Sequence, residues 1–247
     1  MSLLEEITPS PRKVMTLFYI IDTSESMSGT RIGTVNSAME ECKELINDIA
    51  KANDDAEIKV AVMQFSSGCT WITSDTEPIS IETWQWQDLQ AGGITDFGAA
   101  LLELDRKLSR KEFLKSQTGA YAPVILLFSD GGPTDNWEKA LKIIKENNWF
   151  KNAIKIALDI EGSSDRNVLE AFTGNSEAIL DAKDQNTLKK MIHKVSVRAS
   201  EFQSHSKQSE DTISSPEEDS ADIVNAVVNE VEQEESGNDN GEWGEWQ

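Results

Sequence analysis

The sequence has few of the residues that serve the commonest catalytic and structural sites. It contains two cysteines, Cys42 and Cys69, and two histidines, His193 and His205. Two thiols without a repeated spacing form neither a disulfide framework nor a zinc-binding motif, so we interpret both cysteines as reduced. The histidines fall on an expected helix and in an acidic segment, with no catalytic partner evident. Any site must therefore be built mainly from acidic and hydroxyl side chains.

Basic side chains are also scarce, since 23 Lys and Arg face 44 Asp and Glu and the formal net charge is −21. Nucleic-acid affinity depends on cations that neutralise phosphates, so this charge argues against nucleic-acid binding. No apolar run approaches the roughly 20 residues of a membrane span. Residues 1–12 lack the basic region and apolar stretch of a signal peptide. We expect a cytoplasmic protein without a nucleic-acid or membrane partner.

The acidic charge is concentrated toward the end of the chain. Residues 200–247 hold 14 acidic side chains against one basic side chain, Lys207. Such a composition with few apolar residues predicts a mostly disordered tail, although Asp222 to Val231 could form a short helix that would be marginal on its own. The preceding residues are numerous enough to bury a core. We expect one domain over residues 13–199 and an acidic tail over 200–247.

Strand-like and helix-like segments alternate along residues 13–199. Continuous apolar runs indicate buried strands, and apolar residues at helical spacing indicate amphipathic helices. The expected strands are Met15 to Ile21, Glu57 to Phe65, Pro123 to Phe128, Ala153 to Ile160 and Glu177 to Leu180. The expected helices are Arg31 to Lys51, Phe97 to Lys115, Trp137 to Asn147, Arg166 to Phe172 and Gln185 to Ala199.

This alternation predicts an α/β fold with a doubly wound, mostly parallel sheet and helices on both faces. Thr70 to Ser74 is expected to add one antiparallel edge strand. In such sheets, ligands bind beyond the carboxyl ends of the strands. Asp22 and Asp130 each follow an expected strand directly and therefore occupy this kind of position.

Asp22, Ser24 and Ser26 stand at alternating positions where the first strand ends. Because every second side chain of an extended segment points the same way, a turn there can make the three converge. Their oxygens suit Mg²⁺ better than zinc or copper. Taken alone, Ser24 and Ser26 could equally cap a helix, and Asp130 could stabilise a turn.

A glycine-rich loop, Ala91 to Asp96, contributes a further hydroxyl. Its Thr95 lies just before the helix expected at Phe97, and Asp96 is expected to cap that helix. Thr95 alone would be an ordinary turn residue. Its order in the chain, between two strand-end aspartates, favours a shared site.

These elements resemble the von Willebrand factor type A domain family over about Lys13 to Ala199. The family's Asp-x-Ser-x-Ser motif is matched by Asp22, Ser24 and Ser26, its later threonine by Thr95, and the aspartate after the following strand by Asp130. Two details look like the bacterial tellurite-resistance-associated branch: Gly-Gly-x-Thr-Asp at 92–96 and Ser-Asp-Gly at 129–131.

The resemblance implies a Rossmann-like fold with a metal-ion-dependent adhesion site. In that site, the Ser24 and Ser26 hydroxyls would bind Mg²⁺ (or Mn²⁺) directly. Thr95 would bind directly or through water, and Asp22 and Asp130 mainly through water. Neutral hydroxyl ligands leave the ion's charge under-neutralised, so an open position can accept an Asp or Glu carboxylate from a partner protein.

One residue departs from the commonest form of the family, because Glu25 stands where glycine is frequent between the two serines. Two interpretations remain. Glu25 is either a turn residue that points to solvent or an acid that weakens the capture of acidic partners.

The main alternative is a Mg²⁺-dependent phosphatase or phosphotransferase with Asp22 as the nucleophile. A haloacid-dehalogenase-like enzyme needs a second acid two residues further on, where this chain has Ser24, so no general acid or base is evident. The sequence also lacks a P-loop and a Gly-x-Ser-x-Gly elbow. We therefore expect a binding or adaptor module and not an enzyme.

The chain ends in a tandem Gly-Glu-Trp repeat, Gly241 to Gln247. Exposed tryptophans often mark docking sites, and glutamate is the residue type that an adhesion site accepts. The tail could dock into a separate partner or cap the metal site of its own or a neighbouring protomer. The simpler interpretation is a solvated tail that maintains solubility. By family association, a bacterial stress-response complex with kinase and phosphatase partners is expected.

Overall fold

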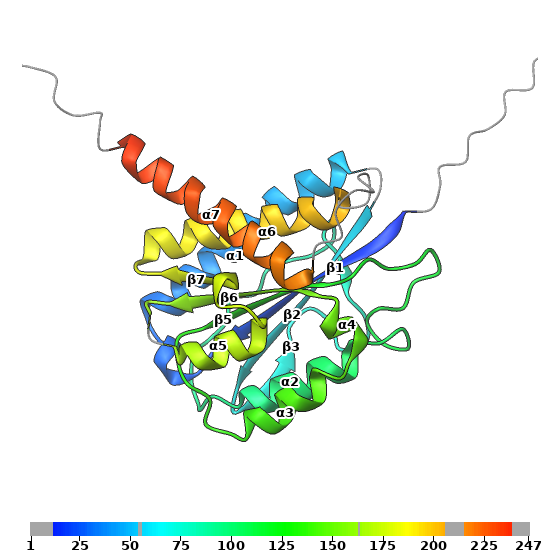
Figure 1. Ribbon diagram of the computed structural model, residues 1–247, viewed down its shortest axis with the longest axis horizontal. Coiled ribbons are helices and arrows are strands. Elements are labelled where there is room, and N and C mark those ends of the chain that lie inside the picture. The colour runs from blue at the N-terminus through cyan, green and yellow to red at the C-terminus, as the bar shows by residue number, and fades with distance from the viewer. Residues whose placement is uncertain (1–11, 54–55, 163, 206–214, 239–247) are drawn as a thin grey trace, which may run out of the picture.

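The computed structural model describes residues 12–53, 56–162, 164–205 and 215–238, and it contains a sheet between two layers of helices (Figure 1). The strand order is β3-β2-β1-β5-β6-β7, and β4 pairs with β2. The strands are β1 (Lys13–Asp22), β2 (Ala56–Ser66), β3 (Gly68–Trp71), β4 (Ile79–Ser80), β5 (Val124–Ser129), β6 (Ile154–Ile160) and β7 (Ile179–Ala182).

The sheet is mostly parallel, which confirms the predicted fold class. The central strand β1 pairs in parallel with β2 on one side and with β5 on the other, and β6 and β7 continue the parallel sheet. The expected antiparallel edge is also present, because β3 runs antiparallel to β2, as does β4. Since the strand order reverses at β1, the end of β1 is the switch point at which ligands bind in such folds.

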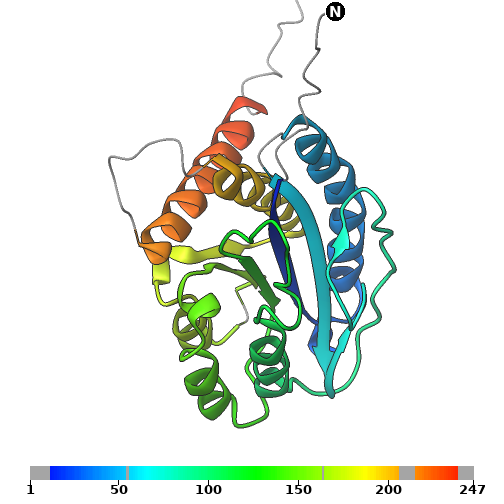
Figure 2. The same ribbon diagram turned by 90° about the vertical axis from the view of Figure 1, so that its right-hand side faces the viewer.

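Helices cover both faces of the sheet, as Figure 2 shows. One face is covered by α1 (Thr30–Ala52), α6 (Gln185–His205) and α7 (Pro216–Asn238). The other face is covered by α2 (Phe97–Lys107), α3 (Trp137–Ile144), α4 (Asn148–Lys151) and α5 (Arg166–Thr173). Two short 3₁₀ helices, η1 (Glu25–Met27) and η2 (Ser176–Ala178), precede α1 and β7. Burial on both faces explains the continuous apolar runs of the central strands.

The helix expected over Phe97 to Lys115 ends earlier, at Lys107. The chain turns back there, and the Phe113 amide donates a hydrogen bond to the Lys107 carbonyl at 3.1 Å. This turn places the Phe113 ring 4.7 Å from the Trp71 ring, centroid to centroid. Burial of aromatic surface therefore ends a helix that local spacing alone would continue.

The structure differs from the predicted disordered tail over Pro216–Asn238, which forms α7. Its buried side chains join the core beneath α6 and include Ile223, Val224, Val227 and Val231. Tertiary packing of this apolar face supplies the stability that an isolated helix lacks. Core packing therefore continues beyond the expected domain limit at residue 199, whereas the Gly-Glu-Trp repeat lies outside the described residues.

Ion pairs also join α7 to α6. Glu230 of α7 contacts Arg198, and it lies 3.2 Å from Lys194, both of α6. Lys194 also pairs with Glu234 at 2.7 Å. Basic side chains of α6 thus neutralise part of the acidic charge of α7. The net charge of residues 200–247 does not show this pairing, because the basic partners precede residue 200.

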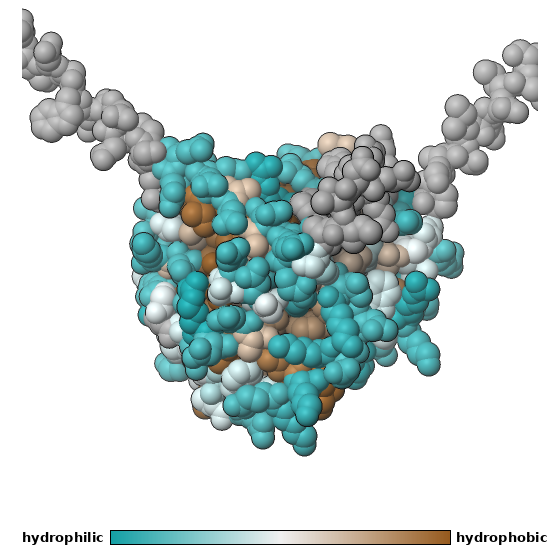
Figure 3. Space-filling model, in the orientation of Figure 1, coloured by the Kyte–Doolittle hydropathy of each residue, from teal (hydrophilic) through white to brown (hydrophobic). Residues whose placement is uncertain are grey.

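The surface in Figure 3 is mostly hydrophilic, with small apolar patches. Within the described ranges, every helix is too short or too polar to cross a membrane. One large apolar side chain that remains exposed is Ile94, at 53%, next to the candidate ligand Thr95.

The docking of α7 can be tested by replacing Ile223, which is 3% exposed, with alanine. We expect a loss of about 2–5 kcal/mol in the free energy of unfolding, because the substitution leaves a cavity under α7. Urea denaturation followed by circular dichroism measures this loss. Asp222→Ala, at an exposed neighbouring position, is the matched control and should change stability by about 0.5 kcal/mol or less. Equal stabilities of the two variants would contradict the packing of α7.

Candidate metal centre

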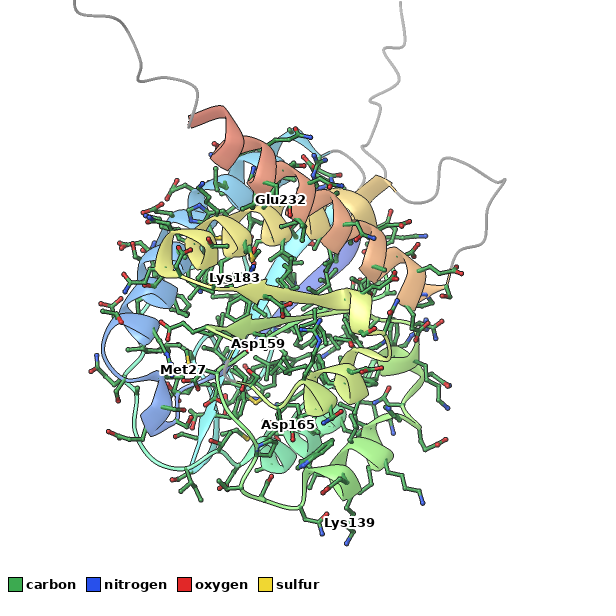
Figure 4. All side chains as sticks on the ribbon, turned by 60° about the vertical axis from the view of Figure 1, so that its left-hand side comes forward. Met27, Lys139, Asp159, Asp165, Lys183 and Glu232 are labelled. Atoms are coloured by element: carbon green, nitrogen blue, oxygen red, sulfur yellow. The ribbon has the colours of Figure 1, made fainter. Side chains whose placement is uncertain are left out.

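The five predicted ligands come from three loops or strand ends at one edge of the sheet. Asp22 is the last residue of β1, and Asp130 directly follows the neighbouring strand β5. Thr95 lies in the connection between β4 and α2. Figure 4 labels three residues on this side of the molecule, namely Met27 in η1, Asp159 near the end of β6 and Asp165 just before α5.

Four of the predicted ligands are linked directly by hydrogen bonds. The Ser24 amide donates to Asp22 Oδ1 at 2.8 Å, and the Ser24 and Ser26 hydroxyls lie 3.1 Å apart. The Ser26 hydroxyl donates to Asp130 Oδ1 at 2.7 Å. Ser129, at the end of β5, donates its hydroxyl to Asp22 Oδ2 at 2.9 Å. The turn after β1 and the end of β5 thus form one cluster of oxygen atoms.

The loop that carries Thr95 is joined to both neighbouring segments through its backbone. The Gly92 amide donates to the Thr23 carbonyl at 2.8 Å, and the Thr134 amide donates to the Thr95 carbonyl at 2.9 Å. Thr95 also borders a small cavity together with Ser129. Its side chain forms no hydrogen bond with Asp22, Ser24, Ser26 or Asp130 among the described contacts. The structure therefore brings Thr95 to the site without joining it to the hydrogen-bonded cluster.

The start of α2 is capped differently from the prediction. The Asp96 carboxylate accepts a hydrogen bond from the Gly68 amide at 2.9 Å and does not cap the helix. Asp135, in the loop after β5, instead accepts from the Gly98 and Ala99 amides at 3.0 and 3.1 Å. A Cβ atom at Gly98 would lie 2.8 Å from Asp135 Oδ2, so glycine permits this approach. The loop after β5 is thereby anchored to the start of α2.

Most of the site is withdrawn from solvent. Asp22 is fully buried, Ser24 and Asp130 are each 2% exposed, and Ser26 is exposed at the mouth. Burial raises the pKa of Asp22, although the hydrogen bonds from Ser24 and Ser129 lower it. A negative charge is therefore costly at this position unless a cation compensates it.

Arg31, in the first turn of α1, also belongs to the site, although no sequence motif marks it. Its guanidinium contacts Asp130 Oδ2, and it donates a hydrogen bond to the Ser26 carbonyl at 2.9 Å. Its Nε atom donates to Glu161 Oε2 at 2.7 Å. Glu161 follows β6 and lies 130 positions away, so no local signal connects it with Arg31. Ser129 stands in the Ser-Asp-Gly motif, which was the one available sign of its role.

The residues present fit a hard divalent cation. Asp22, Ser24, Ser26 and Asp130 provide carboxylate and hydroxyl oxygens, and two of them are buried acids. Oxygen ligands of this kind favour Mg²⁺ or Mn²⁺. In the part of the chain that the structure describes, no group of three or more His, Cys, Asp or Glu could hold a metal ion. The candidate metal centre is instead this cluster of two acidic and two hydroxyl side chains.

Comparison with known proteins gives a match to one family. Residues 17–133 match the von Willebrand factor type A domain. This segment includes all five predicted ligands and ends at residue 133, inside the loop between β5 and α3. No curated protein matches this chain.

Solved structures share the fold at low sequence identity. The pilus adhesin SpaC from Lactobacillus rhamnosus GG superposes with a TM-score of 0.62 at 14% identity, over 77% of this chain and 31% of the adhesin. A von Willebrand factor type A protein from Catenulispora acidiphila has a TM-score of 0.57 at 15% identity, over 76% of this chain and 43% of that protein.

A third similar structure is the proximal thread matrix protein 1 of the mussel byssus with a zinc-occupied MIDAS motif. Its TM-score is 0.51 at 15% identity, over 76% of this chain and 46% of that protein. The chain thus spans less than half the length of each of these three proteins. Residues 17–133 therefore match the von Willebrand factor type A domain, and the chain shares the fold of these solved structures over about three quarters of its length.

Proposed function

We propose that the protein is a metal-dependent protein-binding module. In this proposal, Mg²⁺ or Mn²⁺ accepts an Asp or Glu carboxylate from a partner protein and is held by Asp22, Ser24, Ser26, Thr95 and Asp130. The observation that carries the proposal is the continuous cluster of oxygen atoms at the switch point of the sheet, where the Ser26 hydroxyl bridges from Ser24 to Asp130.

Each residue has a distinct part in the proposed site. The Ser24 and Ser26 hydroxyls would ligate the ion, Thr95 would ligate it directly or through water, and Asp22 and Asp130 would act mainly through water. Ser129 orients Asp22 by its hydrogen bond to Oδ2. The bound ion would supply uncompensated positive charge at the mouth of the site, where an incoming carboxylate could bind it.

The features of similar structures support this proposal. One similar structure is a pilus adhesin, and another has a zinc-occupied MIDAS motif. Both share the fold with this chain at about 15% identity, so neither fixes the metal or the partner. The choice of Mg²⁺ or Mn²⁺ here rests on the all-oxygen set of side chains.

The competing function, nucleophilic catalysis by Asp22, fits the geometry less well. Asp22 is fully buried, and its two carboxylate oxygens accept hydrogen bonds from the Ser24 amide and the Ser129 hydroxyl. A nucleophile must instead reach the reacting atom of a substrate. Ser24 also occupies the place of the acid that a haloacid-dehalogenase-like mechanism requires. The arrangement therefore favours binding over catalysis.

Several narrower expectations stay predictions from the sequence alone. They are the tellurite-type branch, the stress-response complex with kinase and phosphatase partners, the cytoplasmic location, and the docking or self-capping role of the Gly-Glu-Trp repeat. The structures compared above include a pilus adhesin and a byssal matrix protein, and they do not support the tellurite-type branch. Glu25, between the proposed ligands Ser24 and Ser26, is exposed.

The proposed metal binding can be tested by replacing Ser26 with alanine. We expect Ser26→Ala to lower affinity for Mg²⁺ and Mn²⁺ by at least about tenfold, because it removes a ligand without changing the charge. Isothermal titration calorimetry measures the affinity, and pull-downs in Mg²⁺ and in EDTA measure partner capture. Ser28→Ala is a matched control at an exposed position two residues further along the chain. The proposal would be contradicted if the native protein showed no saturable metal binding, or if the native and Ser26→Ala proteins bound the ion with equal affinity.

A second test separates the role of Asp22 in function from its role in stability. In EDTA at pH 7, Asp22→Asn should be as stable as the native protein or more stable by about 1 kcal/mol, because it removes a buried charge. The same variant should bind Mg²⁺ more weakly. Thermal denaturation and calorimetry measure the two effects.

The stability difference should also depend on pH. Because the pKa of Asp22 is raised, protonation favours the folded native protein, and that contribution is lost as the pH rises through the folded-state pKa. Lowering the pH from 7 toward the ordinary aspartate pKa of 3.8 should therefore narrow any advantage of Asp22→Asn. A variant that is strongly destabilised at both pH values would show that the carboxylate is needed for folding.

A further inference from the structure

Arg31 connects the candidate metal centre with a distant turn. Its guanidinium contacts Asp130 Oδ2 and lies 2.7 Å from Glu161 Oε2, while also donating to the Ser26 carbonyl. The Asp130 side chain is fully buried, whereas those of Arg31 and Glu161 are 24% and 34% exposed. Arg31 therefore lies at the mouth of the site, between a buried acid and a partly exposed one.

Both carboxylate oxygens of Asp130 already have partners. One of its carboxylate oxygens accepts the Ser26 hydroxyl at 2.7 Å, and the other contacts Arg31. A divalent ion that recruits Ser26 and Asp130 would have to share these acceptor atoms with the guanidinium. Two cations at one carboxylate repel each other, and the low dielectric of a buried site strengthens that repulsion.

Glu161 has an unusual backbone conformation for a residue with a side chain. With φ at 60°, Glu161 is the one non-glycine residue in the left-handed region among the described parts of the chain. Glycine adopts this conformation without the steric cost that other residues bear, and it stands at the next position, Gly162. The Glu161 amide donates a hydrogen bond to the Ala182 carbonyl at 2.7 Å, which fixes this turn to the end of β7. This turn places the Glu161 carboxylate within hydrogen-bonding distance of Arg31 Nε.

We propose that the Arg31 guanidinium competes with the divalent ion for the Asp130 carboxylate. When the ion binds, Arg31 leaves Asp130 and remains paired with Glu161. This inference rests on the proposed function, since it concerns regulation of the same site. Without the ion, Arg31 neutralises Asp130 and holds the turn after β1 through the Ser26 carbonyl. With the ion, Arg31 gives up Asp130 and keeps Glu161, which it already contacts. Arg31 thereby lowers the affinity of the site for the ion and raises the metal concentration needed to fill it.

The experiment is calorimetric titration of the full chain with Mg²⁺, and separately with Mn²⁺, at neutral pH. We expect Arg31→Gln to bind the ion roughly tenfold or more tightly than the native protein, a change within the usual range for coupled sites. Arg31→Lys keeps the charge but cannot contact both carboxylates with a planar fork, so its affinity should lie between those two. Arg166→Gln is the charge-matched control, because Arg166 pairs with Asp181 at 2.6 Å, and it should match the native affinity.

A double-mutant cycle tests the role of Glu161. Glu161→Gln should weaken metal binding several-fold in the native background, because Arg31 then has Asp130 as its main carboxylate partner. In the Arg31→Gln background the same substitution should have little effect, since Glu161 acts through Arg31. Equal effects in both backgrounds would show that Glu161 acts as a simple nearby charge and would overturn its proposed role.

Two further results have different meanings. If the native protein binds the ion and Arg31→Gln binds it no more tightly, the competition is overturned while the metal site stands. If neither protein binds the ion, the proposed function and this inference both fail. Circular dichroism and thermal denaturation in EDTA check that the variants are folded, and Arg31→Gln should have the lower melting temperature because it leaves Asp130 uncompensated.

Discussion

The pairing of β1 with strands on both sides is the constraint on which the rest of the structure depends. Ten residues of β1 pair with β2, and part of the strand also pairs in parallel with β5. Because β1 is covered by helices on both faces, its end lies inside the protein and Asp22 is fully buried there. The same pairing puts Ser129 and Asp130 beside Asp22. A site at this point is thus a direct result of the sheet order.

The buried acids impose a cost that the surrounding groups offset only in part. Asp22 receives two hydrogen bonds from uncharged donors, and Asp130 contacts Arg31. An uncompensated buried charge is among the costliest features of a folded protein. Its presence beside hydroxyl groups at a switch point fits the cation-binding function proposed for this site. The acidic groups that the proposed function requires therefore lower the stability of the folded protein at this site.

The acidic composition of α7 does not indicate that one of its faces packs on the core. α7 is rich in acids, but its buried face adds Ile223, Val224 and Val227 to the core against α6. Its outer side chains include Glu230, which pairs with bases of α6. Composition averaged over the segment is dominated by the acidic side, whereas stability depends on the narrow apolar side and its partner.

The sequence by itself determined the order of strands and helices, the mostly parallel sheet, and the approach of Asp22, Ser24, Ser26 and Asp130. These features follow from local periodicity and from strand-end positions, which short stretches of sequence display directly. Only the tertiary structure decided that Arg31 meets Asp130 and Glu161, that Asp135 caps α2, and that α7 packs on the core. Each of these contacts joins segments distant in the chain, and its energy comes from burial and charge pairing that exist only after folding.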